Sequence, residues 1–354
     1  MVRFSTRFWV LIFLLLPGGL AAAPQGAEIP FQKYEGIARI QEKITANGYV
    51  FTVAENWLTE LSREQREGLR SRRQGTTGLR QASGACNLGP LRDYLERPLP
   101  ERFDWRDVMG RCYLGPIRQQ GGCGACYAFS ACAAAEAVYN AATGSWNENC
   151  IDFSEAFVAF CLSGLYSGFD GCYGSSYEYE ELEALVRDGV CEEMVFPYDP
   201  KQTSCPLELP VATVRFSAWH RLPCNDVVAI KAAIRWFGAV DASVLTCSAF
   251  DAYRSGLYDD GATACEDIYS GVCYYAASDH TVALVGWDDN GGDGYWILRN
   301  SWGTGWGEQG YMRIKYRAAH VACAACYLVY GGALPVEPAP LVLEDWLPLL
   351  LDED

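Results

Sequence analysis

Apolar residues follow a helical repeat in the first part of the chain's body. An Ala-rich stretch over 126–142 predicts a helix, and Gly144 lies just beyond it, where helices commonly end. Similar spacing and capping residues predict further helices over 154–162, 177–187 and 226–237.

The second part of the body has the pattern of strands. Short apolar runs separated in several places by Gly-rich turns are expected to be strands over 239–245, 281–287, 295–298 and 311–316. Helices followed by strands predict an α+β protein with a helical half and a sheet-based half. A functional site between two such halves is the natural expectation.

The N-terminus has the layout of a secretory signal peptide. Arg3 and Arg7 precede an apolar run over 8–16, and small residues follow at 21–23. The alternative is an uncleaved anchor helix, but the run is too short to span a bilayer. We therefore expect residues 1–23 to be a signal peptide.

Composition narrows the functional classes. The 354 residues are half apolar and carry a net charge of −16, which excludes a disordered chain and argues against binding to a nucleic-acid backbone. Residues 24–98 hold 11 basic and 9 acidic side chains, whereas residues 99–354 hold 15 and 35. The two parts should attract each other at neutral pH and less so in acid. The alternative is that both are simply solvated surfaces.

Turn-rich sequence marks the boundaries. Residues 75–90 contain repeated Gly and a Pro, so they read as a linker, and the body is expected to begin near Leu99. A second boundary follows Pro335. The tail over 336–354 has six acidic residues and no basic one, which predicts a disordered or loosely docked segment.

A Gly-rich turn over 119–124 runs into the first predicted helix at Cys126. The N-terminus of a helix stabilises a thiolate, which is the nucleophilic form of cysteine. The alternative is that Cys126 is half of a disulfide, since the chain has 16 cysteines. A nucleophilic cysteine also needs a histidine and an orienting group.

Only three histidines are present. His220 and His320 lie in no recognisable pattern, whereas His280 opens a predicted strand and Asn300 follows the next strand. The run Cys123-Gly124-Ala125-Cys126-Tyr127, with His280 and Asn300 154 and 174 residues after Cys126, resembles the papain family of cysteine peptidases, which includes the cathepsins. The resemblance extends from about Pro100 to Pro335. It implies a two-lobed α+β fold, with a helical lobe, a β-barrel-like lobe and the active-site cleft between them.

The resemblance implies a role for each site residue. Cys126 would be the nucleophile, His280 the general base and later the acid, and Asn300 the group that orients the imidazole. Gln120 and the backbone N–H of Cys126 would form the oxyanion hole of a reaction that passes through a thioester. The residues expected along the substrate cleft are Gly174, Ser175, Asp279 and Trp302, and Trp302 would also shield the bond between His280 and Asn300 from water.

Two departures from the family pattern leave alternatives open. Ser175 stands where the family has a second glycine, and Tyr127 stands where most members have tryptophan. A binding protein without turnover and an exopeptidase of the dipeptidyl-peptidase type are therefore the rival interpretations to an endopeptidase. The intact set of catalytic residues argues against a binding protein without turnover. The front segment, residues 24–98, is too short to hold both a prosegment and the extra domain of the dipeptidyl-peptidase type, which argues against an exopeptidase of that type.

Sixteen cysteines behind a signal peptide indicate an oxidising compartment. By resemblance the disulfides Cys123–Cys172, Cys161–Cys205 and Cys273–Cys326 are expected, while the pairing of the other cysteines stays open. A zinc site at Cys323 and Cys326 is a weak alternative, because no second pair with matching spacing exists. No metal or organic cofactor is implied.

The front segment is similar to the inhibitory prosegment of cathepsins over 56–64. We therefore expect a zymogen with a prosegment over 24–98, removed near Leu99, and a catalytic domain over 99–335. The expected partners are protein or peptide substrates, the prosegment itself and cystatin-like inhibitors, with no nucleic acid and, after signal removal, no membrane. The expected route is the secretory pathway, leading to a lysosome or vacuole or to the exterior.

Overall fold

The computed structural model describes residues 29–70, 86–175 and 180–331, except for 203, 209, 262–277, 290, 291, 293 and 322. The predicted signal peptide over 1–23 and the predicted tail over 336–354 lie outside the described residues. Within the described part, no helix combines the length and the apolar character that a membrane span requires.

The described strands form one sheet in the order β1-β5-β8-β7-β6-β4-β9-β3, and β2 pairs with β6 at its side. The pairs are antiparallel apart from β5 and β8, which run parallel. The strands are β1 (Val50–Val53), β2 (Arg102–Asp104), β3 (Ala218–Arg221), β4 (Val240–Val244), β5 (Tyr253–Tyr258), β6 (His280–Asp288), β7 (Tyr295–Arg299), β8 (Tyr311–Lys315) and β9 (Ala325–Val329).

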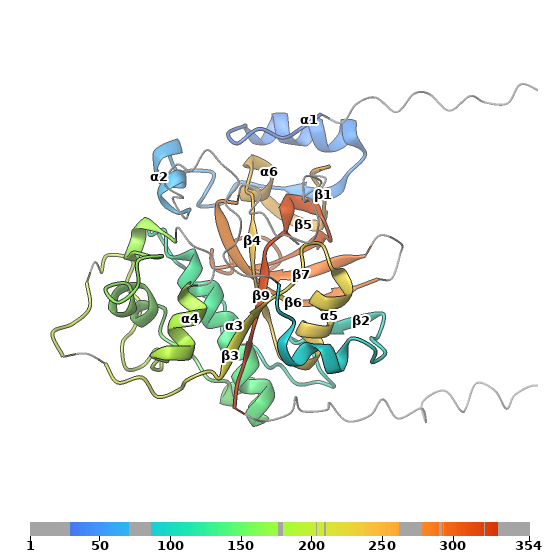
Figure 1. Ribbon diagram of the computed structural model, residues 1–354. Helices are drawn as coiled ribbons and strands as arrows, with labels where there is room; N and C mark the ends of the chain where they lie inside the picture. Colours follow the sequence, from blue (N-terminus) through green and yellow to red (C-terminus); the bar gives the residue numbers. More distant parts are fainter. Residues whose placement is uncertain are drawn as a thin grey trace, which may run out of the picture.

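Helices gather mainly beside this sheet and, in the front segment, above it (Figure 1). The α-helices are α1 (Ile37–Asn47), α2 (Arg63–Gly68), α3 (Cys126–Thr143), α4 (Glu180–Arg187), α5 (Val227–Trp236) and α6 (Ser248–Asp251). Short 3-10 or π turns are η1 (Gly89–Tyr94), η2 (Asn147–Asn149), η3 (Phe157–Leu162), η4 (Gly171–Tyr173) and η5 (Ala318–His320).

The predicted elements of the body are present with small changes at their ends, and residues 177–179 of one predicted helix lie outside the described residues. The helix α3 ends at Gly144, whose φ of 70° is the left-handed conformation that glycine adopts readily. At the start of the helix expected from Ser154, the N–H of Phe157 donates a hydrogen bond to the Ser154 hydroxyl oxygen, but the helix continues as a π-helix.

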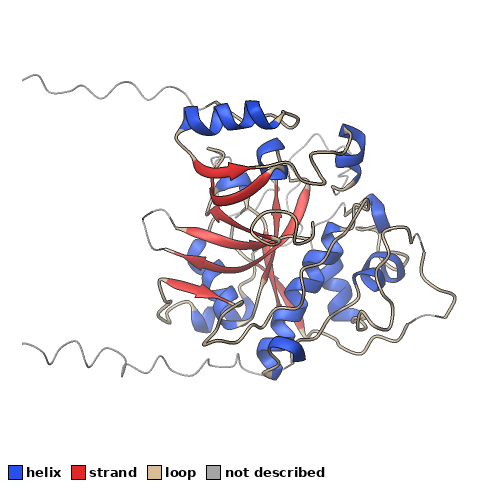
Figure 2. Cartoon of the chain, turned by 180° about the vertical axis from the view of Figure 1, so that it is seen from behind, coloured by secondary structure: helices blue, strands red, loops and turns tan. Residues whose placement is uncertain are grey.

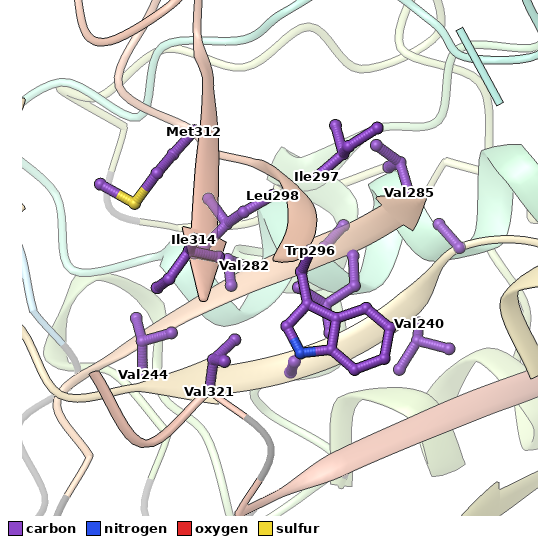
Figure 3. Close-up of a cluster of buried hydrophobic side chains, with 14 of the residues drawn as sticks. Val240, Val244, Val282, Val285, Trp296, Ile297, Leu298, Met312, Ile314 and Val321 are labelled. Carbon is purple, nitrogen blue, oxygen red and sulfur yellow. The ribbon is translucent and has the colours of Figure 1, made fainter. Parts of the chain in front are cut away.

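Two hydrophobic cores meet at α3. One core fills the sheet, with Val240, Val282, Trp296 and Ile314 among the side chains drawn in Figure 3. The other joins α3, η3 and α4 into a helical lobe. Along α3, Ala133, Ala137 and Ala141 belong to the sheet core, whereas Ala128, Ala131, Ala135 and Val138 belong to the helical core. Small side chains on both faces let α3 pack closely against both lobes, and the view from behind shows the same division between helices and strands (Figure 2).

The front segment packs against the sheet lobe. The strand β1 extends the sheet by pairing with β5, and α1 lies across the same end of the lobe (Figure 1). Phe51 of β1 is buried and packs against Tyr258 of β5, with their ring centroids 4.9 Å apart. This segment is therefore part of the folded body of the protein.

The segment over 86–98 is also docked on the body. Its turn η1 buries Leu91 and Tyr94 against α5 and β9, and the hydroxyl of Tyr327 accepts a hydrogen bond from the N–H of Leu91. Arg97 lies over the rings of Tyr94 and Trp236. This segment was predicted to belong to the removable prosegment, yet it contributes side chains to the core of the sheet lobe.

Candidate active site

Cys126 is the first residue of α3 and is completely buried. The preceding loop is held by the disulfide between Cys123 and Cys172 and by a 3.2 Å hydrogen bond from the N–H of Gly124 to the carbonyl oxygen of Cys172. The dipole of the long helix α3 favours a negative charge at its N-terminus, where Cys126 lies. The loop thus presents a cysteine where a thiolate is stabilised.

His280 and Asn300 form a hydrogen bond of 2.8 Å between Nε2 and Oδ1. The amide oxygen only accepts, so Nε2 carries the hydrogen and Nδ1 is the basic nitrogen of the neutral ring. Among the described residues, Nδ1 of His280 has no hydrogen-bond partner. The ring therefore has the tautomer that a general base at Nδ1 requires.

The helix α3 packs against the strand β6, and Cys126 and His280 lie at the same end of this packed pair. The hydroxyl of Ser130 donates a 2.8 Å hydrogen bond to the carbonyl oxygen of Val282. Cys126 lies four residues before Ser130, on the same face of the helix, and His280 lies two residues before Val282, on the same face of the strand. Cys126 thus comes from the helical side of the interface and His280 from the sheet.

Trp302 covers the imidazole. Its ring stacks on His280 with the centroids 4.5 Å apart and an interplanar angle of 24°, and only 1% of Trp302 is exposed. A ring in this position covers one face of the imidazole that is hydrogen-bonded to Asn300.

Gln120 lies in the loop before Cys126 and is held there by hydrogen bonds. Its backbone N–H donates to the carbonyl oxygen of Ser301, and the Ser301 hydroxyl donates back to Oε1 of Gln120 at 2.7 Å. Its Nε2 donates to the carbonyl oxygens of Cys123 and Leu69, both at 2.8 Å. The sequence pattern gave no role to Ser301, although its position directly after Asn300 places it beside the site.

The predicted cleft residues lie on both sides of the site. Gly174 has a φ of 95°, a conformation that favours glycine, and Ser175 next to it is 8% exposed. Asp279 precedes His280, and its Oδ1 accepts hydrogen bonds from the N–H and hydroxyl of Thr246. Tyr127 is buried and donates its hydroxyl to the carbonyl oxygen of Gly171, so this departure from the family pattern lies in the helical core.

The front segment contacts this site directly. The indole N–H of Trp57 donates to the carbonyl oxygen of Trp302 at 3.0 Å, and the amide of Asn56 donates to that of Asp251 at 2.9 Å. A Cβ on Gly124 would lie 3.0 Å from the carbonyl oxygen of Gly68, so the front segment passes immediately over the loop before Cys126. The similarity at 56–64 therefore falls on residues that lie against the site.

Buried charges behind the site were not found from the sequence. Glu136 of α3 and Arg299, which precedes Asn300, form a buried ion pair of 3.5 Å, and burial raises the pKa of Glu136 to about 7. Asp241 on β4 accepts a hydrogen bond from Ser130, and burial also raises its pKa to about 7. Such residues carry no local motif, because they meet only after α3 packs on the sheet.

The cysteine pairing matches the sequence expectation at two places. The disulfides Cys123–Cys172 and Cys161–Cys205 are both present. At the third place Cys323 is disulfide-bonded, whereas Cys326 carries a thiol. The pairing expected for Cys326 is thus corrected, and its expected partner Cys273 lies outside the described residues. Cys326 lies on β9, next to the edge strand β3 of the sheet, opposite Asp241 of β4 and Arg221 of β3.

Comparisons with known proteins agree with this geometry. Residues 99–330 match the family described as "Papain family cysteine protease". Cysteine proteinase 2 of Entamoeba histolytica is 34% identical over 226 residues, which cover 62% of this chain and 65% of that protein. Similar relatives are matched over 56% to 65% of their length, so the chain spans less than two thirds of these proteins.

Solved structures share the fold. Procathepsin L 3 from the larval midgut of Tenebrio molitor superposes with a TM-score of 0.64 at 24% identity, over 83% of this chain and 87% of that one. The Carica candamarcensis cysteine protease CMS1MS2, in complex with E-64, gives a TM-score of 0.54 at 28% identity, over 66% of this chain and 100% of that one. Because the family match covers the whole stretch that carries Cys126, His280 and Asn300, the chain belongs to the papain family of cysteine proteases.

Proposed function

We propose that this protein is a cysteine endopeptidase made as a secreted zymogen. The observation that carries the proposal is the hydrogen bond between Nε2 of His280 and Asn300, which leaves Nδ1 as the basic nitrogen of the ring. His280 lies at the end of β6 that is nearest the start of α3. Cys126 at that helix start is the nucleophile that this base serves.

The reaction follows from the roles of these groups. His280 takes the thiol proton of Cys126, and the thiolate attacks the carbonyl carbon of a peptide bond. The side-chain amide of Gln120 and the N–H of Cys126 donate to the oxyanion. The His280 imidazolium then protonates the leaving amine, and a thioester remains on Cys126. Water activated by His280 hydrolyses the thioester and releases the acid product.

The front segment is proposed to inhibit the enzyme until it is removed. The carbonyl oxygen of Leu69 accepts a hydrogen bond from the side-chain amide of Gln120. The indole N–H of Trp57 donates to the carbonyl oxygen of Trp302. Both contacts use positions that a substrate would need. The solved structure of Tenebrio molitor procathepsin L 3, a proform that shares this fold, supports this proposal.

An endopeptidase fits the sequence better than an exopeptidase. Some exopeptidases of this family have an inserted, histidine-containing loop that closes one end of the cleft. This chain has no histidine between Cys172 and Cys205, where that loop would lie. Export through the secretory pathway is supported by the pattern at 1–23 and by disulfides, which persist in oxidising compartments. Delivery to a lysosome or vacuole, or to the exterior, completes the proposal.

The test is labelling of the acid-processed protein with E-64, the epoxide bound in the Carica enzyme, followed by mass spectrometry of the modified peptide. We expect modification at Cys126, its loss in His280→Ala, and cleavage of unfolded protein that is lost in Cys126→Ala. A correctly folded and processed sample that takes no label at Cys126 would contradict the proposal. It would favour a binding protein of the same fold.

A further inference from the structure

Two aspartates lie together on one side of the candidate site. Asp251 ends α6, and its backbone carbonyl oxygen accepts a hydrogen bond from the indole N–H of Trp306, whose ring lies 5.3 Å from that of Trp302. Asp279 is held by Thr246, in the loop that leads into α6. The main chain at Asp251 and the carboxylate of Asp279 are thus held by the aromatic residues and the loop that lie beside His280.

The guanidinium of Arg70 lies between these aspartates. Its Nη2 donates to both oxygens of Asp251 at 2.7 and 2.6 Å, and its Nε lies 3.8 Å from Oδ2 of Asp279. The side chains of Arg70 and Asp251 are 4% and 0% exposed. Among the described residues, both hydrogen bonds to the Asp251 carboxylate come from Arg70, and Oδ2 of Asp279 accepts none. This is a built site for a cation with an arginine side chain already in it.

Other cations of the front segment approach the same pair. Nζ of Lys33 lies 3.4 Å from Oδ2 of Asp279, and Nη1 of Arg66 lies 4.0 Å from Oδ2 of Asp251. Three basic residues therefore face two acidic ones across this contact. The charge difference seen between the two parts of the sequence is concentrated here.

The position of Arg70 relates the pair to the scissile bond. The carbonyl oxygen of the preceding residue, Leu69, accepts the side-chain amide of Gln120, so the main chain at Arg70 lies within one residue of the proposed oxyanion hole. Asp279 adjoins His280, which gives its proton to the leaving amine in the proposed reaction. The acidic pair consequently lies on the side of the cleft that holds the residues after the scissile bond.

We propose that Asp251 and Asp279, once the front segment has left, form a subsite for an arginine or lysine side chain in the first or second residue after the cleaved bond. In the zymogen Arg70 occupies this subsite and stands in for the substrate. The inference rests on the proposed peptidase function and adds the substrate class: peptides with a basic residue on the leaving-group side. A buried carboxylate that has lost the cations bound to it gains from any cation that replaces them.

The experiment compares two internally quenched peptides that differ only at the first residue after the cut, Arg in one and citrulline in the other. Citrulline has the same shape without the charge. The full chain is produced, acid-processed, and its active sites are counted by titration with E-64. We expect kcat/KM to be roughly tenfold higher for the Arg peptide at low salt, the scale of one hydrogen bond to a charged group. Mass spectrometry of a digested peptide mixture should show Arg and Lys enriched at the first two positions after the cut.

Two variants assign the effect. Asp251→Asn should bring the ratio of the two kcat/KM values close to one, whereas Glu148→Gln, at an exposed acid in η2, should leave the ratio unchanged. Should Asp251→Asn not yield processed protein, the wild-type ratio at rising ionic strength decides, because an ionic subsite weakens with salt.

The outcomes separate the two proposals. No site titrated by E-64 would mean that the peptidase proposal fails. Titrated sites with equal kcat/KM for both peptides at low salt would overturn the acidic subsite alone, as would a preference for Arg that Asp251→Asn leaves intact.

Discussion

The side-chain amide of Gln120 donates a 2.8 Å hydrogen bond to the carbonyl oxygen of Leu69, a residue of the front segment. The same amide is the proposed donor to the oxyanion, and it cannot serve both acceptors with the same hydrogen. Inhibition therefore need not distort the catalytic residues. The front segment takes one hydrogen of the Gln120 amide, while the hydrogen bond between His280 and Asn300 is kept.

Replacing Gln120 should separate catalysis from thiol reactivity. Gln120→Ala removes one oxyanion donor, so we expect kcat to fall by roughly 10² to 10³-fold. The rate of Cys126 alkylation by iodoacetamide should change far less, because that reaction forms no oxyanion. Steady-state kinetics and alkylation rates on the processed protein provide the measurement. An equal loss in both rates would show that Gln120 supports the cysteine rather than the oxyanion.

Arg70 should be the strongest ionic contact of the front segment. Arg70→Ala leaves Asp251 buried without its partner, and removing one member of a buried pair typically costs about 3 kcal/mol or more. The zymogen should melt at a lower temperature and process itself faster at neutral pH. Arg63→Ala is the matched control, because the pair of Arg63 with Glu67 is exposed and should change neither quantity appreciably. Equal behaviour of the two variants would contradict the assignment.

The sequence pattern was sufficient for elements that form from local signals. The Ala-rich helix α3 and the apolar strands β6 and β7 follow from their own residues, and the Gly-rich turn before Cys126 predicted that this cysteine begins a helix. The strand β9 was not predicted, although it contains Tyr327 and Val329, which favour strands; its five residues are too few for a distinct pattern, and its pairing with β3 and β4 appears only in the fold. The contact of Arg70 with Asp251 joins residues 181 positions apart, and no local pattern carries such information.

Acid should loosen the front segment through Glu35. Burial alone would raise the pKa of this carboxyl, but hydrogen bonds from Lys43 and from the N–H of Gln32 lower it below its usual value. A carboxyl with a lowered pKa stabilises the folded state above its unfolded pKa, and that contribution is lost as the pH falls through the lower folded value. Glu35 anchors α1 near Ser248 at the start of α6, so its protonation weakens the docking.

The measurement is the rate of self-processing as a function of pH. Wild-type protein should process faster only as the pH drops below the usual carboxyl range, whereas Glu35→Gln should process readily at neutral pH and show a smaller pH dependence. Glu42→Gln, in an exposed pair with Arg39, is the control and should follow the wild type. A wild-type pH profile in Glu35→Gln would place the acid trigger elsewhere.

The docked segment over 86–98 changes where processing is expected. Cleavage near Leu99 would release a segment whose Leu91 and Tyr94 belong to the core of the sheet lobe, and it would expose the surface of α5 beneath them. We therefore expect the N-terminus of the mature protein to lie upstream of Cys86, so that this segment stays on the enzyme. N-terminal sequencing of the acid-processed protein measures this directly, and a first residue at or after Leu99 would refute it. Leu91→Ala gives a second measure. With the segment retained, the variant should lower the free energy of unfolding of the mature enzyme by about 2 to 5 kcal/mol, whereas a released segment would leave the mature enzyme unaffected.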